Sequence, residues 1–378
     1  MLAVRASTLI AVNEVITRSD FMALEKEWND LVEATHEEPF HRHEFIRTWI
    51  EHFAPEADLS ILTGRNRTGR LIAALPLMKA RGPVSGLMAR QILSTSNPHS
   101  CRFDMIAEDA TTAGESFFAY LAADKSWDML RIADVPSGGN AWHLYRAAEA
   151  AGFPVGTWES QRSPYLELPS SYDKLLEGMN SHFRSNLRRH RRRLESMGTI
   201  TFERVTGGTN LQERLEECLA IEQKSWKGLQ GTAILQDTET RGFYTQLARI
   251  AASHNYLSLF LLNLNGQPIA FHFGFTYGDG YYMPKIGYDE AFAAGCPGLV
   301  LLEEIMKDSI RRGLKRCDFL GMDMPWKRDW SKQACRHDWL FIYRDAAFGR
   351  ALHEIKFKWI PAAKHLLHKW RWNNGKAN

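Results

Sequence analysis

Two side chains in the last quarter of the chain could move protons or stabilise charge. Asp323 precedes Met324-Pro325, and Lys327 lies between two tryptophans. A carboxylate in this place either acts as a general base or caps a turn before the proline. A lysine flanked by aromatic rings either neutralises an oxyanion or a phosphate, or is a solvated loop residue. Both alternatives stay open for each residue.

A run of arginines is the second charged feature. Residues 181–193 hold six arginines and no acid, and apolar residues recur among them at helical spacing. We expect Arg184 and Arg188 to bind an anionic acceptor, such as a nucleotide-linked sugar or a lipid phosphate. A solvated basic face is the alternative. DNA is disfavoured as a partner, because the chain outside this run and the basic tail 350–378 is acidic and carries no DNA-binding motif.

A strand meander precedes Asp323 and would help to position it. Asn265-Gly266 and Asp279-Gly280 each separate apolar runs, and both dipeptides suit the positive φ angles of type I′ turns. Antiparallel strands are therefore expected at 257–262, 269–277 and 281–288. His272 falls in the middle strand between two phenylalanines, where it is either a core residue or a contact with substrate.

A helix and a final strand follow the meander. Pro297-Gly298 suits the first turn of a helix, whose apolar residues recur at helical spacing until Gly313. A strand at 315–320 should run parallel to 281–288, since a helix joins the two. This order of elements indicates an acyl-transfer enzyme, in which the acceptor loses a proton and the developing oxyanion needs a fixed donor.

Length and composition limit the fold class. The chain has 378 residues, of which 44% are hydrophobic and 24% charged, as in globular proteins of two or three domains. Its five cysteines lack a zinc-like spacing, which argues against a disulfide framework or a structural metal and favours the reducing cytoplasm. No apolar run is long enough to span a membrane.

The first half resembles a diverged copy of the second. Residues 69–73 follow an apolar run as residues 266–270 do, and residues 128–136 resemble residues 318–325 with one gap. Two matches in the same order at a similar interval indicate a duplicated domain.

We therefore expect a degenerate first domain at 1–162 and a second domain at 163–345. Residues 346–378 should form a basic amphipathic helix and tail, interrupted near Pro361. This helix would dock on the core, contact an anionic membrane surface peripherally, or join subunits.

The second half resembles the GNAT acyltransferases, in particular the cellulose-biosynthesis-type (BioF2-like) acetyltransferases, which are related to the tandem-domain Fem aminoacyltransferases. The resemblance covers about residues 163–343 and, more faintly, the first half. It is carried by an arginine-rich helix, a Glu-Gln-Lys-Ser-Trp turn, a strand end followed by Pro-Gly, and a last strand that runs into Trp-Lys. These motifs are residues 183–189, 221–226, 288–289 with 297–299, and 318–321 with 326–327.

The resemblance implies a mixed-sheet α/β fold of tandem GNAT-like domains with a C-terminal helix. It also implies that acetyl-CoA or another acyl-CoA binds, without a metal, where strand 283–288 parts from strand 316–321. The implied donor-binding residues are Lys285, Ile286, Gly287, Gly295, Pro297, Gly298 and Leu299. The implied catalytic residues are Lys327, Asp323 and Tyr288, and those at the acceptor are Arg184, Arg188, Trp326 and His272.

The chain departs from the GNAT signature at the diphosphate loop, which prefers Arg or Gln first and Gly or Ala last. Phe292 and Pro297 stand at these places, and proline has no N–H to donate. We expect acyl transfer to an amine or hydroxyl of a small-molecule, glycan-linked or lipid-linked acceptor, with an inactive first domain. Two alternatives stay open: an aminoacyl-tRNA donor, and a non-catalytic accessory role in polysaccharide or envelope synthesis.

Overall fold

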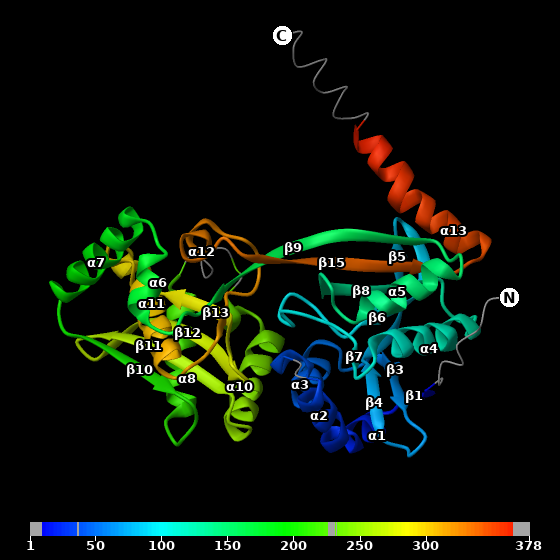
Figure 1. The fold of residues 1–378 in the computed structure, drawn as a ribbon, viewed down its shortest axis with the longest axis horizontal. Helices are drawn as coiled ribbons and strands as arrows, with labels where there is room; N and C mark the ends of the chain where they lie inside the picture. Colours follow the sequence, from blue (N-terminus) through cyan, green and yellow to red (C-terminus); the bar gives the residue numbers. More distant parts are fainter. Residues whose placement is uncertain (1–9, 36–37, 226–230, 232, 366–378) are drawn as a thin grey trace, which may run out of the picture. The chain divides into compact units, whose positions relative to one another are not determined.

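The computed structural model describes residues 10–35, 38–225, 231 and 233–365 (Figure 1). The chain divides into a first unit, Met1–Ile46 with Glu56–Ser160 and His337–Asn378, and a second unit, Arg47–Pro55 with Gln161–Arg336. Whereas the expected domains are continuous stretches, these units exchange segments. None of the described helices is long and apolar enough to cross a membrane.

The first unit contains mainly antiparallel strands, and helices connect some of them. Its strands are β1 (Ala11–Val15), β2 (Asp58–Leu59), β3 (Ile61–Arg65), β4 (Leu71–Leu75), β5 (Leu77–Val84), β6 (Leu87–Ser94), β7 (Ile106–Ala107) and β8 (Met129–Pro136). Its helices are α1 (Arg18–Ala23), α2 (Glu25–Ala34), the start of α3 (His43–Phe53), α4 (Ala110–Ala123) and α5 (Ala141–Ala150). The 3₁₀ helix Pro39–His41 precedes α3.

The second unit contains the predicted meander and the helix after it. Its helices are α6 (Tyr172–Glu177), α7 (Ser181–Glu195), α8 (Leu211–Gln223), α10 (Thr238–Ser253), α11 (Pro297–Arg311) and α12 (Pro325–Trp330), with 3₁₀ helices at Ile234–Gln236 and Glu290–Gly295. Its strands are β10 (Ile200–Val205), β11 (Leu257–Leu264), β12 (Gln267–Tyr277), β13 (Gly280–Tyr288) and β14 (Arg316–Asp318).

The two units repeat one pattern of strand pairing. In the second unit β10, β11, β12 and β13 pair antiparallel in turn, and β13 pairs parallel with β14 across α11. In the first unit β1 pairs with β3, β3 with β4 and β5 with β6, all antiparallel, and β6 pairs parallel with β8 across α4. Gly69 and Gly266 end equivalent hairpin turns with φ angles of 83° and 82°. The expected mixed α/β fold with a repeated domain is therefore confirmed.

Two long strands complete the sheets. The end of β9 (Val155–Glu167) pairs antiparallel with β14 in the second unit, although β9 follows the first unit's α5 in the chain. The end of β15 (Ala334–Tyr343) pairs antiparallel with β8 in the first unit, although it follows α12. The paired end of β9 belongs to the second unit and the paired end of β15 to the first, so each strand begins in one unit and ends in the other.

The two turns of the meander differ from each other. Asn265 and Gly266 both have positive φ angles, 51° and 82°, as expected. In the second turn Tyr277 pairs with Gly280, so the central residues are Gly278 and Asp279. The expectation that Asp279-Gly280 forms this turn is wrong by one residue, because Gly278 takes the positive φ angle of 55° at the first central position, as in type II′ turns.

The C-terminal helix begins as α13 (Ala347–Glu354), which buries Leu352 against the first unit. A π-helical stretch, Ile355–Trp359, follows and then returns to α-helix. The irregularity precedes Pro361 because proline lacks an N–H and its ring crowds the preceding turn. The end of the expected helix, from residue 366, lies outside the described residues.

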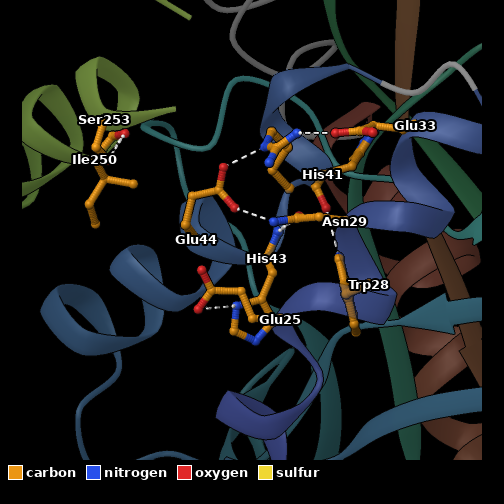
Figure 2. Close-up of polar contacts among 10 residues, drawn as sticks. Glu25, Trp28, Asn29, Glu33, His41, His43, Glu44, Ile250 and Ser253 are labelled. Atoms are coloured by element: carbon orange, nitrogen blue, oxygen red, sulfur yellow. Dashed lines mark hydrogen bonds and ion pairs between the residues drawn. The ribbon is translucent and has the colours of Figure 1, made fainter. Parts of the chain in front are cut away.

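A buried polar cluster joins α2 to the start of α3 in the first unit (Figure 2). The carboxylate of Glu44 pairs with Arg42 and accepts a hydrogen bond of 2.8 Å from Asn29 Nδ2. Arg42 also lies 3.2 Å from Glu33. Although burial opposes ionisation, the hydrogen bond from Arg42 keeps the pKa of Glu44 below its ordinary value.

Candidate functional site

β13 and β14 lie side by side over only three residues each. Gly280–Tyr282 pair with Arg316–Asp318, where β14 ends. The chain then turns through Leu320 and Gly321, whose φ angles are 48° and 57°, while β13 continues to Tyr288. The parting of two parallel strands that the family resemblance implied is therefore present in the second unit.

A β-bulge marks the point where β13 departs from β14. The register between β12 and β13 shifts so that Met283 and Pro284 together lie opposite the single residue Gly274. Proline cannot donate to a strand ladder, and within sheets it is confined to edges and bulges. Pro284 was thus a signal of the parting strands that our sequence analysis did not use.

The first turn of α11 faces this region without a side-chain cap. Cys296 precedes it in a left-handed conformation (φ 46°, ψ 56°), and Pro297 takes the first helical position. The amides of Leu299 and Val300 donate to the Cys296 carbonyl over 3.0 and 3.2 Å. Gly298 therefore contributes the first-turn N–H that has no acceptor inside the helix. Such an N-terminus attracts an anion.

The equivalent place in the first unit is already filled. The carboxylate of Asp109 accepts hydrogen bonds from the amides of Thr111 and Thr112 at the start of α4. Hydrogen bonding by Thr112 lowers the pKa of Asp109, so the helix start holds a negative charge of its own. Furthermore, β6 ends one residue after its pairing with β8, and Ser94 Oγ accepts a hydrogen bond from the Ala133 amide of β8. Both features disfavour a second anion site here.

Two of the expected donor-binding glycines are required by packing within the protein. A Cβ atom on Gly287 would lie 2.5 Å from the Phe271 ring. A Cβ atom on Gly295 would lie 2.3 Å from Leu194 Cδ2 on α7. Both distances are too short for carbon atoms, so these glycines allow close packing of protein elements.

Gly298 is different, because its surroundings leave room. A Cβ atom there would meet only Tyr288 Cδ1, at 3.6 Å, an ordinary contact. Tyr288 ends β13 and is half-buried beside the start of α11. Burial, followed by the charge of Glu290 and a hydrogen bond with it, raises the pKa of Tyr288. The phenol is therefore protonated at neutral pH and can serve as an acid or hydrogen-bond donor.

The arginines of α7 have different environments. Arg184 Nη1 donates to the Leu176 carbonyl over 3.3 Å. Arg191 pairs with Glu303 of α11 over 2.9 Å and so ties the two helices together. Arg188 is exposed. Sequence reasoning selected Arg184 and Arg188 but not Arg189 and Arg193. Burial raises the pKa of Cys296, and the positive charges of Arg189 and Arg193 act to lower it.

The loop after β14 encloses Lys327. Its side chain is buried, and Nζ donates to the carbonyls of Leu320 and Met322, the latter over 2.8 Å. Asp323 instead forms an ion pair of 2.9 Å with Arg328. A hydrogen bond from Arg328 lowers the pKa of Asp323, which makes its carboxylate a weaker base. The catalytic roles assigned to Lys327 and Asp323 stay predictions.

Three further predicted residues lie on or near the sheet. His272 is buried in β12, with Nδ1 3.2 Å from Met283 Sδ, and it pairs across strands with Ile286. The ammonium of Lys285 lies 5.3 Å from the centre of the Tyr244 ring. The structure thus surrounds His272 with protein groups.

One hydrophobic core supports both ends of the site. Partly buried side chains from β13, the 3₁₀ helix Glu290–Gly295, α11 and the start of α12 pack against the same cluster of buried residues; they include Tyr288, Phe292, Leu299 and Trp326. The structure thus brings together Tyr288, Gly298 and Leu299 directly, and it places Trp326 on the same core. Together these elements can hold an anion at α11 and an extended chain along β13.

Residues 181–328 match the family described as acetyltransferase (GNAT) domain. The match contains every site residue predicted above and lies entirely in the second unit. No curated protein matches the chain in sequence.

Solved structures resemble the whole fold at low sequence identity. FemX superposes with a TM-score of 0.57 and 13% identity, covering 85% of this chain and 96% of that one. The C-terminal domain of a putative lysylphosphatidylglycerol synthetase from Agrobacterium fabrum gives 0.55 and 11%, covering 89% and 96%. L-PGS from Bacillus licheniformis gives 0.52 and 11%, covering 90% and 96%. Since the coverage extends over both units, these proteins share the two-unit fold.

Proposed function

We propose that this protein transfers an acyl group from an acyl-CoA, most simply acetyl-CoA, to an amine or hydroxyl; the match of residues 181–328 to the acetyltransferase (GNAT) domain family supports this proposal. The observation that carries the proposal is the parting of β13 and β14 beside the uncapped start of α11. The diphosphate of the donor would lie at the Gly298 amide, and its pantetheine arm would follow β13 beyond the Pro284 bulge.

Tyr288 is the residue best placed to assist the reaction. It lies beside Gly298, and its raised pKa keeps the phenol protonated. When the acceptor attacks the thioester, its nitrogen or oxygen forms a bond to the acyl carbon and releases a proton to solvent, while the C–S bond breaks and its electron pair leaves on the CoA sulfur. Tyr288 would stabilise or protonate that sulfur. Lys327 would position the loop that follows β14, since its ammonium binds two of the loop's carbonyl oxygens.

The first unit would not bind a second donor. The Asp109 carboxylate occupies the start of α4, and β6 lacks an extension comparable to that of β13. We therefore propose one donor site per chain, with an acceptor from the small-molecule, glycan-linked or lipid-linked classes.

Transfer from an aminoacyl-tRNA is the second candidate. Four exposed arginines on α7 favour it, because clustered cations on one helix suit a nucleic-acid backbone; they are Arg188, Arg189, Arg192 and Arg193. Binding of this kind would weaken steeply with salt, since each neutralised phosphate releases counterions.

Thermal unfolding with acetyl-CoA, CoA and a bulk tRNA tests these alternatives. At 100 times its Kd, a ligand that binds only the native state stabilises it by about 2.7 kcal/mol, which raises Tm. We expect acetyl-CoA to raise Tm for the wild type and for Gly298→Ala, whose Cβ fits, but not for Gly298→Trp. An unchanged Tm with every CoA at millimolar concentration would refute an acyl-CoA donor. A salt-sensitive rise with tRNA alone would support the second candidate, and no rise with any ligand would support a non-catalytic role.

A further inference from the structure

The arginines of α7 point in three directions around the helix. Successive residues of an α-helix turn by about 100°, so residues four apart share a face. Phe183, Leu187 and Leu194 form the buried face. Arg184 and Arg191 lie on one flank of that face, and both bond to other parts of the protein; their partners are Leu176 and the carboxylates of α11.

Arg189 and Arg193 lie on the opposite flank, one turn apart. Both are exposed. Within the described parts of the chain, neither guanidinium forms an ion pair with a carboxylate. The third direction, toward solvent, belongs to Arg188 and Arg192, which are exposed as well. Arg189 and Arg193 therefore have the same charge and exposure as Arg188 and Arg192, and they differ from them only in the side of the helix on which they lie.

The flank that carries Arg189 and Arg193 borders the start of α11. Between them in sequence is His190; burial and the charge of Arg189 lower the pKa of its imidazole, while the Ala294 backbone acts to raise it. Leu194 packs against Gly295, at the close distance that only glycine allows. Burial raises the pKa of the Cys296 thiol, while the positive charges of Arg189 and then Arg193 act in the opposite direction. The contact of Leu194 with Gly295, together with the effects of Ala294 on His190 and of the two arginines on Cys296, indicates that this flank of α7 lies next to the start of α11.

A diphosphate at this place would need positive charge that the loop does not supply. Phe292 stands where the GNAT signature has an arginine or glutamine, and Pro297 offers no N–H. Helix dipole and a first-turn amide stabilise an anion only in part, whereas guanidinium groups form charge-assisted hydrogen bonds with phosphate oxygens. Two arginines one turn apart match the two charges of a diphosphate.

We propose that Arg189 and Arg193 bind the diphosphate of the acyl-CoA donor from α7 and replace the charged side chain missing from the loop before α11. This inference depends on the proposed acyl-CoA function. It assigns donor recognition to an arginine pair that is separate from Arg184 and Arg188.

Isothermal titration of the full-length protein with CoA tests the proposal. Arg189→Glu and Arg193→Glu should each weaken CoA binding by about 10- to 100-fold, the range expected for losing a charged hydrogen bond. Arg192→Glu is the matched control, with the same helix, the same charge change and the solvent-facing side; it should change the Kd by less than about threefold. Thermal unfolding without ligand verifies that the three variants fold alike.

Two truncated donors identify the phosphate that is bound. Dephospho-CoA keeps the diphosphate, so Arg193→Glu should weaken its binding as strongly as that of CoA. A loss restricted to CoA would assign the arginines to the 3′-phosphate and overturn the proposal. Equal losses in Arg192→Glu and Arg193→Glu would overturn it too, because they would reflect general attraction to a basic helix. If wild-type protein binds no CoA, the proposed function fails instead.

Discussion

Leu194 of α7 packs so closely on Gly295 that a Cβ atom on the glycine would lie 2.3 Å from Leu194 Cδ2 and 2.8 Å from Cγ. This contact fixes the helix that carries Arg189 and Arg193 against the loop before α11. The electrostatics of the candidate donor site therefore depend on an apolar contact in which no charged group takes part.

Gly295→Ala should destabilise the protein and weaken donor binding together. The added methyl group overlaps Leu194, and overpacking of this kind costs about 1–3 kcal/mol. Because Leu194 is a flexible side chain, shortening it in the double variant Gly295→Ala with Leu194→Ala should restore part of the donor affinity, although it removes apolar packing.

Thermal unfolding and CoA titration measure the two effects. Gly178→Ala is the control, since its Cβ atom would meet only the Leu175 carbonyl at 3.5 Å and the Lys174 carbonyl at 3.9 Å. A Gly295→Ala protein with unchanged Tm and CoA affinity would show that α7 can shift without consequence.

Lys327→Met should destabilise the second unit. The methionine keeps the length of the side chain but leaves the carbonyls of Leu320 and Met322 without their buried donor, at a cost of about 1–3 kcal/mol. Lys332→Met is a suitable control, because Lys332 Nζ donates to the exposed Arg328 carbonyl, and surface changes usually cost less than about 0.5 kcal/mol. Urea unfolding measures both. If Lys327→Met lost acyl transfer at unchanged stability, Lys327 would act at the reacting atoms instead of holding the loop.

Glu303 should make the contact between α7 and α11 sensitive to acid. Although burial opposes its ionisation, hydrogen bonding by Tyr172 and the charges of Arg191 and Lys307 lower the pKa of Glu303. A carboxylate with a lowered pKa in the fold contributes stability above its unfolded pKa of about 4.3, and this stability is lost as the pH falls through the folded value.

The stability difference between wild type and Glu303→Gln should therefore be constant near pH 7 and shrink below about pH 4.3. Urea midpoints between pH 7 and pH 3 measure it. Glu177→Gln at an exposed position is the control for removing one negative charge. A difference that stays constant down to pH 3 would contradict the assignment.

Local sequence signals predicted the meander and the helix after it accurately. The apolar runs, the Asn265-Gly266 turn and Pro297 are local signals, because each determines the backbone conformation of residues close to it in sequence. The structure has β11, β12, β13 and α11 close to the expected bounds. The second turn was misplaced by one residue because Gly278 and Gly280 both flank Asp279, and only the strand register decides which of them takes the positive φ angle.

Contacts between distant residues could not be predicted in the same way. Nothing in β15 indicates that its end pairs with β8, some 200 positions earlier in the chain. Similarly, the run of six arginines gave no sign of which would face α11, because that depends on how α7 packs. The close packing of Phe271 on Gly287 and of Leu194 on Gly295 was equally hidden in the sequence, and the donor-binding role of these glycines stays a prediction.

Tyr288→Phe should lower kcat for acyl transfer by about 100-fold, the lower range for loss of a positioned acid, with little change in the affinity for acetyl-CoA. Burial and Glu290 raise the pKa of Tyr288, so an acid at this position stays protonated until the pH exceeds the ordinary tyrosine value of about 10. Any decline in wild-type kcat between pH 7 and pH 9 should therefore persist in Tyr288→Phe.

Steady-state rates across this range, once an acceptor has been found by screening amines and alcohols, measure kcat and its pH dependence. Tyr281→Phe provides a control, because Tyr281 is fully buried in β13 and its hydroxyl cannot reach a ligand. A Tyr288→Phe enzyme with wild-type kcat would remove Tyr288 from the mechanism, and would leave the departing thiolate to be stabilised by backbone donors.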